Sequence, residues 1–227
     1  MEYGQFCPVA KAMELLGEKW SLLILRELHM GASRFNELQR GLSLISPTVL
    51  TKRLKELADA ELILRKKIPG QRGNEYFLTQ AGLETLPLLK GIGDWGMRWA
   101  RGDIRDSELD VELLMLYLQR SIITDSLPGS QSVIRFKFTD LKKLGNWWLL
   151  IKGSNVDICL EDPGKEVDVY LTTDLRTMVN CWMGDETYRA AIADKRLKLV
   201  GPSVLTRNIQ HWISDSIFAD IAPAREI

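Results

Sequence analysis

Residues 46–57 read Ser-Pro-Thr-Val-Leu-Thr-Lys-Arg-Leu-Lys-Glu-Leu, and this stretch decides the fold of the first half of the chain. Ser-Pro is a strong start signal for a helix, because serine accepts a hydrogen bond from a free backbone amide and proline at the first helical position loses none. Leucines then recur at helical spacing and define one apolar face: Leu50, Leu54 and Leu57. The opposite face carries polar and charged side chains: Thr48, Lys52, Lys55 and Asp59, with Thr51 on its flank.

A helix of this kind suits insertion into the major groove of DNA. Lysines neutralise phosphates, and threonine hydroxyls and methyls contact base edges. An amphipathic surface helix without any DNA contact has the same pattern, so the segment alone leaves both interpretations open. The stretch from residue 40 to 72 favours DNA, because its basic residues outnumber its acidic ones, Glu56, Asp59 and Glu61. The basic residues are Arg40, Lys52, Arg53, Lys55, Arg65, Lys66, Lys67 and Arg72.

The chain as a whole has an ordinary globular composition. Its 227 residues are enough for one large or two modest domains, and 30 Lys and Arg balance 30 Asp and Glu. The net charge therefore does not indicate nucleic-acid binding. The prediction of DNA binding rests on the local basic stretch at residues 40–72. Three unevenly spaced cysteines, Cys7, Cys159 and Cys181, indicate reduced thiols rather than a disulfide framework. We find no signal-peptide pattern and no membrane-length apolar run, and we expect a soluble cytoplasmic protein.

The residues before Ser46 predict three further helices. The first covers residues 8–18, and the second, Glu18–Met30, is apolar nearly all round, which indicates a central buried helix. Ser33 is expected to cap a short third helix, Arg34–Gly41, with Phe35 and Leu38 facing inward. Residues 41–45 then turn into the helix at Ser46, which completes a helix-turn-helix.

The residues after this helix predict a β-hairpin. Residues 62–68 and 76–78 read as two short strands about a Gly/Pro-rich turn, with basic residues near the tip. A helix-turn-helix followed by a basic hairpin is a winged helix, in which the hairpin reaches the DNA beside the recognition helix. The predicted DNA-binding residues are Arg34, Ser46, Thr48, Thr51, Lys52, Arg53, Lys55, Lys66, Lys67 and Arg72.

A long apolar helical stretch follows. Thr79 is expected to cap it, Pro87 to kink or interrupt it, and its apolar residues run from Leu83 to Trp99. They exceed what a small winged domain needs for its own packing. A dimer contact, shared with the first helix, is one explanation, and contact with the second domain is the other.

Five motifs in this half resemble the HxlR-type bacterial transcription regulators: Cys7-Pro8-Val9-Ala10, Gly17-Glu18-Lys19-Trp20, Leu23-Ile24-Leu25-Arg26-Glu27-Leu28, Arg34-Phe35-Asn36-Glu37-Leu38 and Ser46-Pro47-Thr48-Val49-Leu50. The resemblance covers roughly residues 5–100 without large gaps. It implies a dimeric winged helix-turn-helix regulator that binds a pseudo-palindromic operator. It also points to Cys7, because some family members sense oxidants or electrophiles through a cysteine at that motif position. Packing of Cys7 as a small buried hydrophobe is the alternative.

The second half predicts an α+β domain. We assign residues 1–103 to the winged domain and 104–227 to this second domain, with residues 101–106 as the hinge. A helix at 111–122 precedes four strands, expected to form a meander, and then helices, a fifth strand and a last helix at Ser203–Trp212. The four strands are Val133–Thr139, Trp147–Lys152, Val156–Glu161 and Val167–Thr172. The overall fold class is therefore α+β, with a winged helix-turn-helix domain first.

Residues 147–151, 156–164 and 194–202 of this domain resemble the sterol carrier protein fold, with a likeness that extends over about residues 107–212. In that fold a sheet and its helices enclose an apolar tunnel, so the resemblance implies a pocket for an apolar small-molecule effector. The expected lining is Phe136, Phe138, Ile151, Ile158, Met178 and Trp182. The alternative is that these side chains fill a solid core, and the fold alone establishes no ligand.

The sequence gives little support to an enzyme. His29 and His211 lie in different predicted domains, and no phosphate loop, nucleophile elbow or metal-ligand pair is found, so we predict no catalytic residue, metal or cofactor. The favoured interpretation is a cytoplasmic, homodimeric, DNA-binding transcriptional regulator whose second domain senses a hydrophobic ligand. A thiol redox regulator acting through Cys7 and a lipid or hydrophobe carrier are the alternatives.

Overall fold

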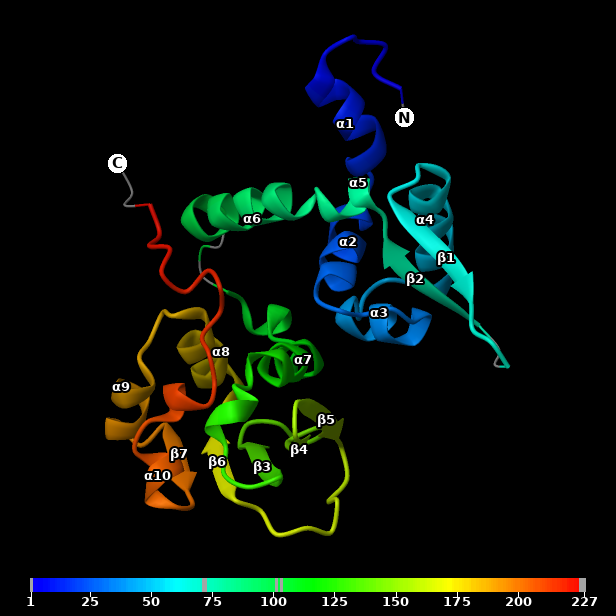
Figure 1. The fold of residues 1–227 in the computed structure, drawn as a ribbon. Coiled ribbons are helices and arrows are strands. Elements are labelled where there is room, and N and C mark those ends of the chain that lie inside the picture. Colours follow the sequence, from blue (N-terminus) through cyan, green and yellow to red (C-terminus); the bar gives the residue numbers. More distant parts are fainter. Residues whose placement is uncertain (1, 71–72, 101, 103, 225–227) are drawn as a thin grey trace. The chain divides into compact units, whose positions relative to one another are not determined.

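The protein divides into two compact units, Met1–Trp95 and Gly96–Ile227. The structure is a computed structural model, and it describes residues 2–70, 73–100, 102 and 104–224. Figure 1 traces the chain through both units. In the described residues, no helix combines the length and the apolar character needed to cross a membrane.

The N-terminal unit is a winged helix-turn-helix. Its elements are α1 (Pro8–Leu16), α2 (Ser21–His29), α3 (Phe35–Gly41), α4 (Pro47–Asp59), β1 (Ile63–Lys67), β2 (Asn74–Leu78), α5 (Gln80–Leu83) and α6 (Leu86–Trp95). The two strands pair antiparallel, as the sequence predicted, with Arg65 opposite Tyr76 at the middle of the hairpin. The core is one apolar cluster whose buried residues include Ile24, Leu25, Leu38, Leu50, Leu54, Leu57, Ile63 and Tyr76.

One expected helix boundary of this unit is wrong. The second helix begins at Ser21 rather than Glu18, because Trp20 adopts a left-handed backbone conformation with φ of 83° and ends the preceding turn. The helix is largely buried, as expected, with Ile24, Leu25 and Leu28 in the core, although Leu23 is exposed and the charged Glu27 is buried. Hydrophobic periodicity alone does not reveal a left-handed turn at a bulky residue.

The apolar stretch after the hairpin is interrupted near Pro87, one of the two outcomes expected, rather than kinked at that residue. Thr79 caps α5, as expected, by accepting a hydrogen bond from the Gly82 amide at 3.1 Å. The break falls at residues 84–85, and Pro87 then occupies the first turn of α6, where proline is tolerated. A π-helical turn, η1 (Gly96–Ala100), follows in the second unit.

The C-terminal unit is α+β, as the sequence predicted. Its elements are η1, η2 (Asp106–Glu108), α7 (Val111–Ser121), η3 (Thr124–Ser126), β3 (Gln131–Phe138), β4 (Asn146–Lys152), β5 (Asn155–Cys159), β6 (Val169–Thr173), α8 (Leu175–Met183), α9 (Tyr188–Ala193), β7 (Leu197–Val200), α10 (Ser203–Thr206) and η4 (Ile209–His211). The expected last helix, Ser203–Trp212, is therefore wrong, because α10 stops at Thr206 and a separate 3-10 turn follows.

The strands form one five-stranded sheet with the order β5-β4-β3-β6-β7. The expected four-strand meander is wrong: β6 pairs with β3 rather than with β5, and the two strands run parallel. A period of two residues identifies a strand but carries no information about its partner. The linker 160–168 carries the chain from one edge of the sheet past β4 and β3 to the other side.

The helices cover one face of this sheet. Side chains from α7, α8 and α9 and from every second residue of the strands join one buried cluster. Trp147 belongs to that cluster, whereas Trp148 faces the opposite side and packs with Val133 and Leu150, as alternation along a strand requires. Of the predicted pocket residues, Phe136, Phe138, Ile151 and Met178 are buried in the cluster, and Ile158 and Trp182 pack against it half-buried.

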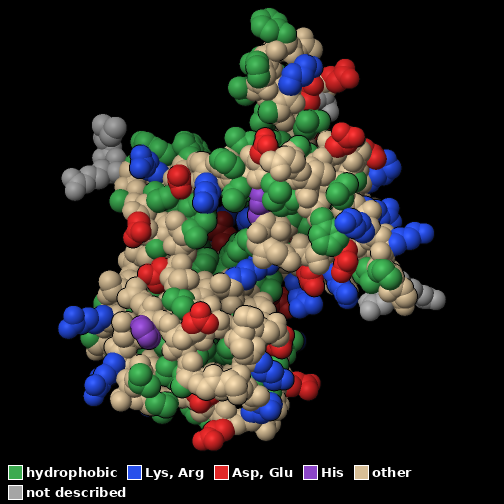
Figure 2. Space-filling model, in the orientation of Figure 1, with side chains coloured by type: hydrophobic (Ala, Val, Ile, Leu, Met, Phe, Trp, Pro, Cys, Tyr) green, Lys and Arg blue, Asp and Glu red, His purple; other side chains and the backbone are tan. Residues whose placement is uncertain are grey.

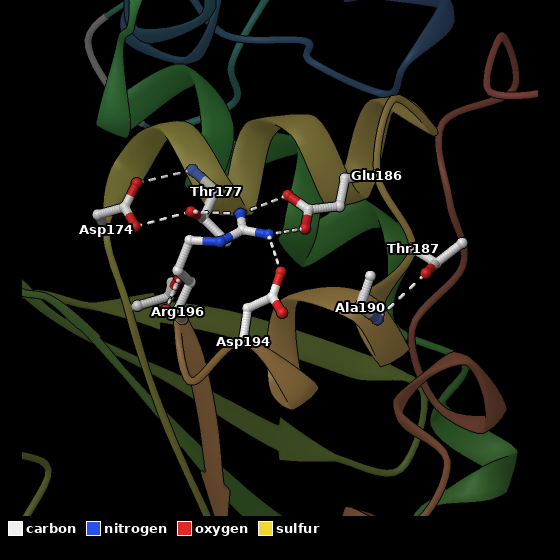
Figure 3. Close-up of polar contacts among 8 residues, drawn as sticks. Asp174, Thr177, Glu186, Thr187, Ala190, Asp194 and Arg196 are labelled. Atoms are coloured by element: carbon white, nitrogen blue, oxygen red, sulfur yellow. Dashed lines mark hydrogen bonds and ion pairs between the residues drawn. The ribbon is translucent and has the colours of Figure 1, made fainter.

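A polar network fixes the edge strand β7 to the helices (Figure 3). Arg196, one residue before β7, forms ion pairs with Glu186 and with Asp194, whose Oδ2 lies 3.1 Å from the guanidinium. These two carboxylates raise the pKa of Arg196 above its ordinary value. Asp174 caps α8 by accepting a hydrogen bond from the Thr177 amide at 2.8 Å. The network holds the α8–α9 connection and the start of β7 in one place.

Candidate DNA-binding surface

A buried ion pair anchors α3 to α2. The carboxylate of Glu27 is fully buried, and Oε1 accepts hydrogen bonds from Nε and Nη2 of Arg26 at 3.0 and 2.8 Å. The same Nη2 donates to the carbonyl of Gly41 at 3.3 Å. A Cβ at residue 41 would lie 2.2 Å from Oε2 of Glu27. Only glycine therefore lets the end of α3 approach this carboxylate, and that approach sets the direction of the turn into α4.

The start of α3 is fixed by Glu37 rather than by the predicted Ser33 cap. The Glu37 carboxylate accepts hydrogen bonds from the backbone amides of Ser33 and Arg34 at 2.8 and 3.0 Å, and Arg34 occupies the cap position. Burial raises the pKa of Glu37, but the two amides outweigh it, so that the net pKa lies below its usual value. The capping carboxylate is thus held in its charged form.

The hairpin is attached at the same point. The amide of Tyr76 donates to the carbonyl of Ser33 at 2.8 Å, and Arg34 forms a β-bridge with Glu75. The Arg34 guanidinium lies 3.7 Å from the Glu75 carboxylate and remains half-exposed. The hairpin and the helix-turn-helix are therefore one rigid assembly within this unit.

Helix α4 presents a polar face to solvent. Ser46 caps it by accepting a hydrogen bond from the Val49 amide at 3.3 Å, and its three leucines are buried, both as predicted. The exposed predicted residues are Ser46, Thr48, Thr51, Lys52 and Lys55. The Thr51 hydroxyl donates to the Pro47 carbonyl at 2.8 Å, which leaves the Thr51 methyl as the group free for outward contact.

Arg53 does not join this exposed face. Its side chain is only 13% exposed and forms ion pairs with Glu18 at 2.6 Å and Glu56 at 2.5 Å. It connects α4 to the turn between α1 and α2, so its role in the structure is to position the helix. Sequence patterns could not reveal this ion pair, because Glu18 lies 35 positions earlier in the chain.

The exposed lysines of α4 have acidic neighbours one turn along the helix. Lys52 lies 3.8 Å from Glu56, and Lys55 pairs with Asp59, whose hydrogen bond raises the pKa of Lys55. Exposed pairs of this kind contribute little to stability. DNA phosphates can therefore replace the carboxylates as partners at little cost.

Lys66 and Lys67 are exposed on β1 beside the hairpin turn, and Lys66 Nζ lies 5.2 Å from the centre of the Phe77 ring. Arg72, also predicted to bind DNA, lies outside the described residues. Figure 2 shows Lys and Arg side chains gathered on the side of the N-terminal unit where Figure 1 places α4 and β1, with acidic side chains among them. The predicted phosphate-binding residues thus come from two adjacent elements.

Helices α1 and α6 expose apolar side chains and contain no buried residue. Figure 2 shows hydrophobic side chains on the surface of α1. The exposed apolar residues of this unit outside α4 and the hairpin are Tyr3, Phe6, Val9, Met13, Leu15, Leu23, Leu44, Leu83, Leu86, Leu88, Ile92 and Trp95. So many large apolar side chains at the surface mark an interaction site rather than scattered exposure. Cys7 stands at the N-cap of α1, half-buried.

The described residues contain no group of three or more His, Cys, Asp and Glu side chains arranged to hold a metal ion. Cys181 is buried, and burial raises the pKa of its thiol to about 12. Cys159 is half-buried on β5.

Comparisons with known proteins match each half of the chain to a different family. Residues 15–103 match the HxlR-like helix-turn-helix family, and residues 124–213 match the SCP-2 sterol transfer family. The uncharacterized HTH-type transcriptional regulator YvaP of Bacillus subtilis is 36% identical over 101 residues, which are 44% of this chain and 94% of YvaP. The uncharacterized HTH-type transcriptional regulator Mb3122 of Mycobacterium bovis is 39% identical over 89 residues, 39% of this chain and 56% of that protein. The reduced form of the transcriptional regulator YodB from B. subtilis matches at 31% identity and a TM-score of 0.38, over 44% of this chain and 100% of YodB.

Proposed function

This chain belongs to the HxlR-like helix-turn-helix family of transcriptional regulators, and we propose that it binds a duplex operator as a homodimer, with α4 in the major groove. The observation that carries the proposal is the exposed face of α4. Three buried leucines pin the helix, Ser46 caps it, and its threonines and lysines point outward beside a basic hairpin. A DNA partner places this activity in the cytoplasm.

The side chains that contact bases and those that contact phosphates have different roles in this proposal. Thr48 and Thr51 contact base edges, and the Thr51 methyl suits the methyl group of thymine. Ser46 and Lys52 share this recognition face, Lys55 lies nearer the DNA backbone, and the phosphates on the hairpin side are bound by Arg34, Lys66, Lys67 and Arg72. Arg53 acts indirectly, since its ion pairs with Glu18 and Glu56 set the position of α4.

The homodimer is proposed to form through α1 and the apolar stretch Leu83–Trp99. Ile92 and Trp95, at successive positions of the α6 face, are 51% and 61% exposed, and Val9 of α1 is 70% exposed. Burial of this surface against a second copy removes it from water. Two copies related by a two-fold axis then present two recognition helices to the half-sites of a pseudo-palindromic operator.

The C-terminal unit is proposed to sense an apolar small molecule. The match of residues 124–213 to the SCP-2 sterol transfer family supports this assignment. The proposed binding side chains are Phe136, Phe138, Ile151, Ile158, Met178 and Trp182. Ligand binding regulates the operator only if the ligand binds the two states of the protein with different affinity. Operator affinity measured with a panel of fatty acids and hydrophobic drugs tests this part, and no change with any compound would remove it.

The DNA-binding part is tested with an operator selected from a random duplex library. Thr48→Ala and Thr51→Ala should each relax base preference by about 1–3 kcal/mol, whereas Thr51→Val should keep it because the methyl remains. Thr206→Ala is the matched control, because the Thr206 hydroxyl donates to the Pro202 carbonyl, four residues earlier, just as Thr51 donates to Pro47. Unchanged operator affinity in both recognition-helix variants, with the fold intact, would show that α4 does not read the bases.

A thiol switch is the second candidate for the regulatory step. Cys7 forms the N-cap of α1, half-buried, and Pro8 follows it. A change at this residue acts on α1, one of the two proposed dimer helices. If Cys7 is the sensor, peroxide should lower the operator affinity of the wild type and leave Cys7→Ser unaffected. An equal response in both proteins would exclude Cys7.

A further inference from the structure

The face of the C-terminal sheet opposite the helices carries an unusual set of side chains. The strand register places Lys198, Thr172, Lys137 and Asn146 in one row across β7, β6, β3 and β4. The neighbouring row holds Val200, Tyr170, Arg135, Trp148 and Cys159. Three cations lie in these two rows, and the strands contribute no carboxylate to them. The next row holds two carboxylates: Asp157, opposite Leu150, and Asp168, which precedes β6 and accepts a hydrogen bond from the Val133 amide at 2.7 Å. The linker 160–168 also meets this row, because Val167 packs against Val133 and Leu150.

Arg135 is held at the centre of this face by aromatic rings. Its guanidinium carbon lies 5.4 Å from the centre of the Trp148 ring and 5.9 Å from that of Tyr170. Its Nη2 donates to the side-chain oxygen of Asn146 at 3.0 Å. These contacts orient the cation without neutralising it, since neither the rings nor the amide carries a negative charge.

Hydrogen-bond donors on this face are left without acceptors. Nε of Arg135 and the indole nitrogen of Trp148, which is 7% exposed, have no partner among the described residues. Lys137 and Lys198 are exposed and likewise form no ion pair within the described part of the chain. Nε of Arg135 and the indole nitrogen are themselves buried, so Lys137 and Lys198 are the donors that a ligand reaches directly. Exposed cations without a partner favour a ligand rich in acceptor oxygens and negative charge.

We propose that this outer sheet face binds a single-stranded nucleic acid. Tyr170 is 40% exposed at the centre of the rows and offers a ring on which a base stacks, while Lys137, Lys198 and Arg135 bind the phosphates around it. A row across four strands spans about 14 Å, enough for two to three nucleotides. A flat sheet does not enter a groove of duplex DNA, which admits a helix or a two-stranded ribbon. The surface is separate from the duplex-binding residues of α4.

The experiment measures binding of a fluorescent oligodeoxythymidine of 20 nucleotides to the full chain by anisotropy. The double variant Lys137→Glu, Lys198→Glu should bind the oligonucleotide at least about tenfold more weakly, and the loss of two phosphate contacts should flatten its log–log salt slope by about 1.4. The control, Lys152→Glu with Lys165→Glu, makes the same change in net charge at exposed lysines outside the two rows, and it should bind nearly as the wild type does. Affinity for the selected duplex operator should stay unchanged in both.

Substitution of Tyr170 is an independent test that leaves the net charge of the protein unchanged. Tyr170→Ala should weaken oligonucleotide binding about tenfold, the effect of losing one stacked base, and Tyr170→Phe should retain it. Equal losses in the two lysine double variants would overturn the proposal in favour of non-specific charge attraction. Competition by polyglutamate as strong as that by unlabelled oligonucleotide would overturn it in favour of an acidic protein partner. Failure of the wild type to bind the oligonucleotide would also overturn it, and thermal unfolding of each variant shows that the fold is kept.

Discussion

Gly41 shows how one residue directs the whole recognition element. It ends α3 where the chain passes the buried carboxylate of Glu27, and its carbonyl accepts a hydrogen bond from Arg26. No side chain fits there, because a Cβ would collide with the carboxylate rather than with the end of a flexible chain in solvent. The sequence shows a glycine that ends a helix but gives no sign that a buried acid is the reason for it.

The collision at Gly41 gives the first prediction. Gly41→Ala should lower the free energy of unfolding by about 1–3 kcal/mol, because the buried ion pair must shift to make room. Gly91→Ala is the control: Gly91 lies inside α6 with nothing within 4 Å of the added Cβ, so alanine should stabilise that helix by up to about 1 kcal/mol. Urea unfolding of the three proteins measures both changes. A Gly41→Ala protein as stable as the wild type would contradict this account of the α2–α3 contact.

Glu37 gives a prediction that depends on pH. Its folded-state pKa is lowered, so the carboxylate stabilises the protein above its unfolded value of about 4.3, and this contribution is lost as pH falls through the folded value. Glu37→Gln should therefore cost about 1 kcal/mol at pH 7, as loss of a helix cap does, and progressively less below about pH 4. Glu166→Gln, at an exposed loop carboxylate, should show no such trend. A difference between wild type and Glu37→Gln that grows as pH falls would refute the capping role.

At the scale of the element, the sequence predicts helices and strands from local patterns, but it does not predict which distant residues or strands pair with them. The Ser-Pro start and the three leucines of α4 are contained in twelve consecutive residues, and the structure confirms them. Within the sequence of α4, Arg53 resembles its exposed neighbours, because its ion-pair partner Glu18 lies far away in the sequence, between α1 and α2. In the second unit the strands were found to within a few residues, yet the parallel pairing of β6 with β3 depends on a nine-residue linker whose path no periodicity encodes. The predicted helix boundary was wrong where an unusual backbone conformation sets it, as the left-handed Trp20 does at the start of α2.

The hairpin provides the prediction at this scale. Replacing Lys66 and Lys67 with alanine should weaken binding to all duplex sequences alike, because phosphate contacts carry no sequence information. The loss of two contacts should reduce the slope of log affinity against log salt by about 1.8. Lys142→Ala with Lys143→Ala, in the exposed β3–β4 loop of the other unit, is the matched control and should leave the slope unchanged. A change in base preference with an unchanged slope would mean that the hairpin reads bases instead.

At the scale of the whole molecule, two units with separate cores are joined in one chain. The first belongs to a family of DNA-binding regulators, and the second matches a family named for sterol transfer. Helices α1 and α6 expose large apolar side chains and contain no buried residue. From the sequence we predicted more apolar residues after the hairpin than the core of the winged domain requires, and the exposure of those side chains agrees with this prediction.

Sedimentation tests the proposed homodimer. The wild type at micromolar concentration should sediment as one species of about twice 25.9 kDa. Ile92→Glu should shift it toward the monomer, because a charge would be buried without a partner in the contact. Val204→Glu, at an exposed valine of α10, makes the same kind of change elsewhere and should leave the dimer intact. A wild-type monomer that binds a half-site with full affinity would contradict the dimer.

The most direct test of the central claim is a hydroxyl-radical footprint on duplexes selected from a random library. We predict an enriched pseudo-palindrome with two protected half-sites whose centres lie about 34–36 Å apart or a multiple of that distance, as two α4 helices in successive major grooves require. Thr48→Ala with Thr51→Ala should lose the preference for the selected sequence, and Thr206→Ala should keep it. Selection that enriches no sequence, or a footprint that is the same for the recognition-helix variant and the wild type, would contradict the claim that α4 reads the operator.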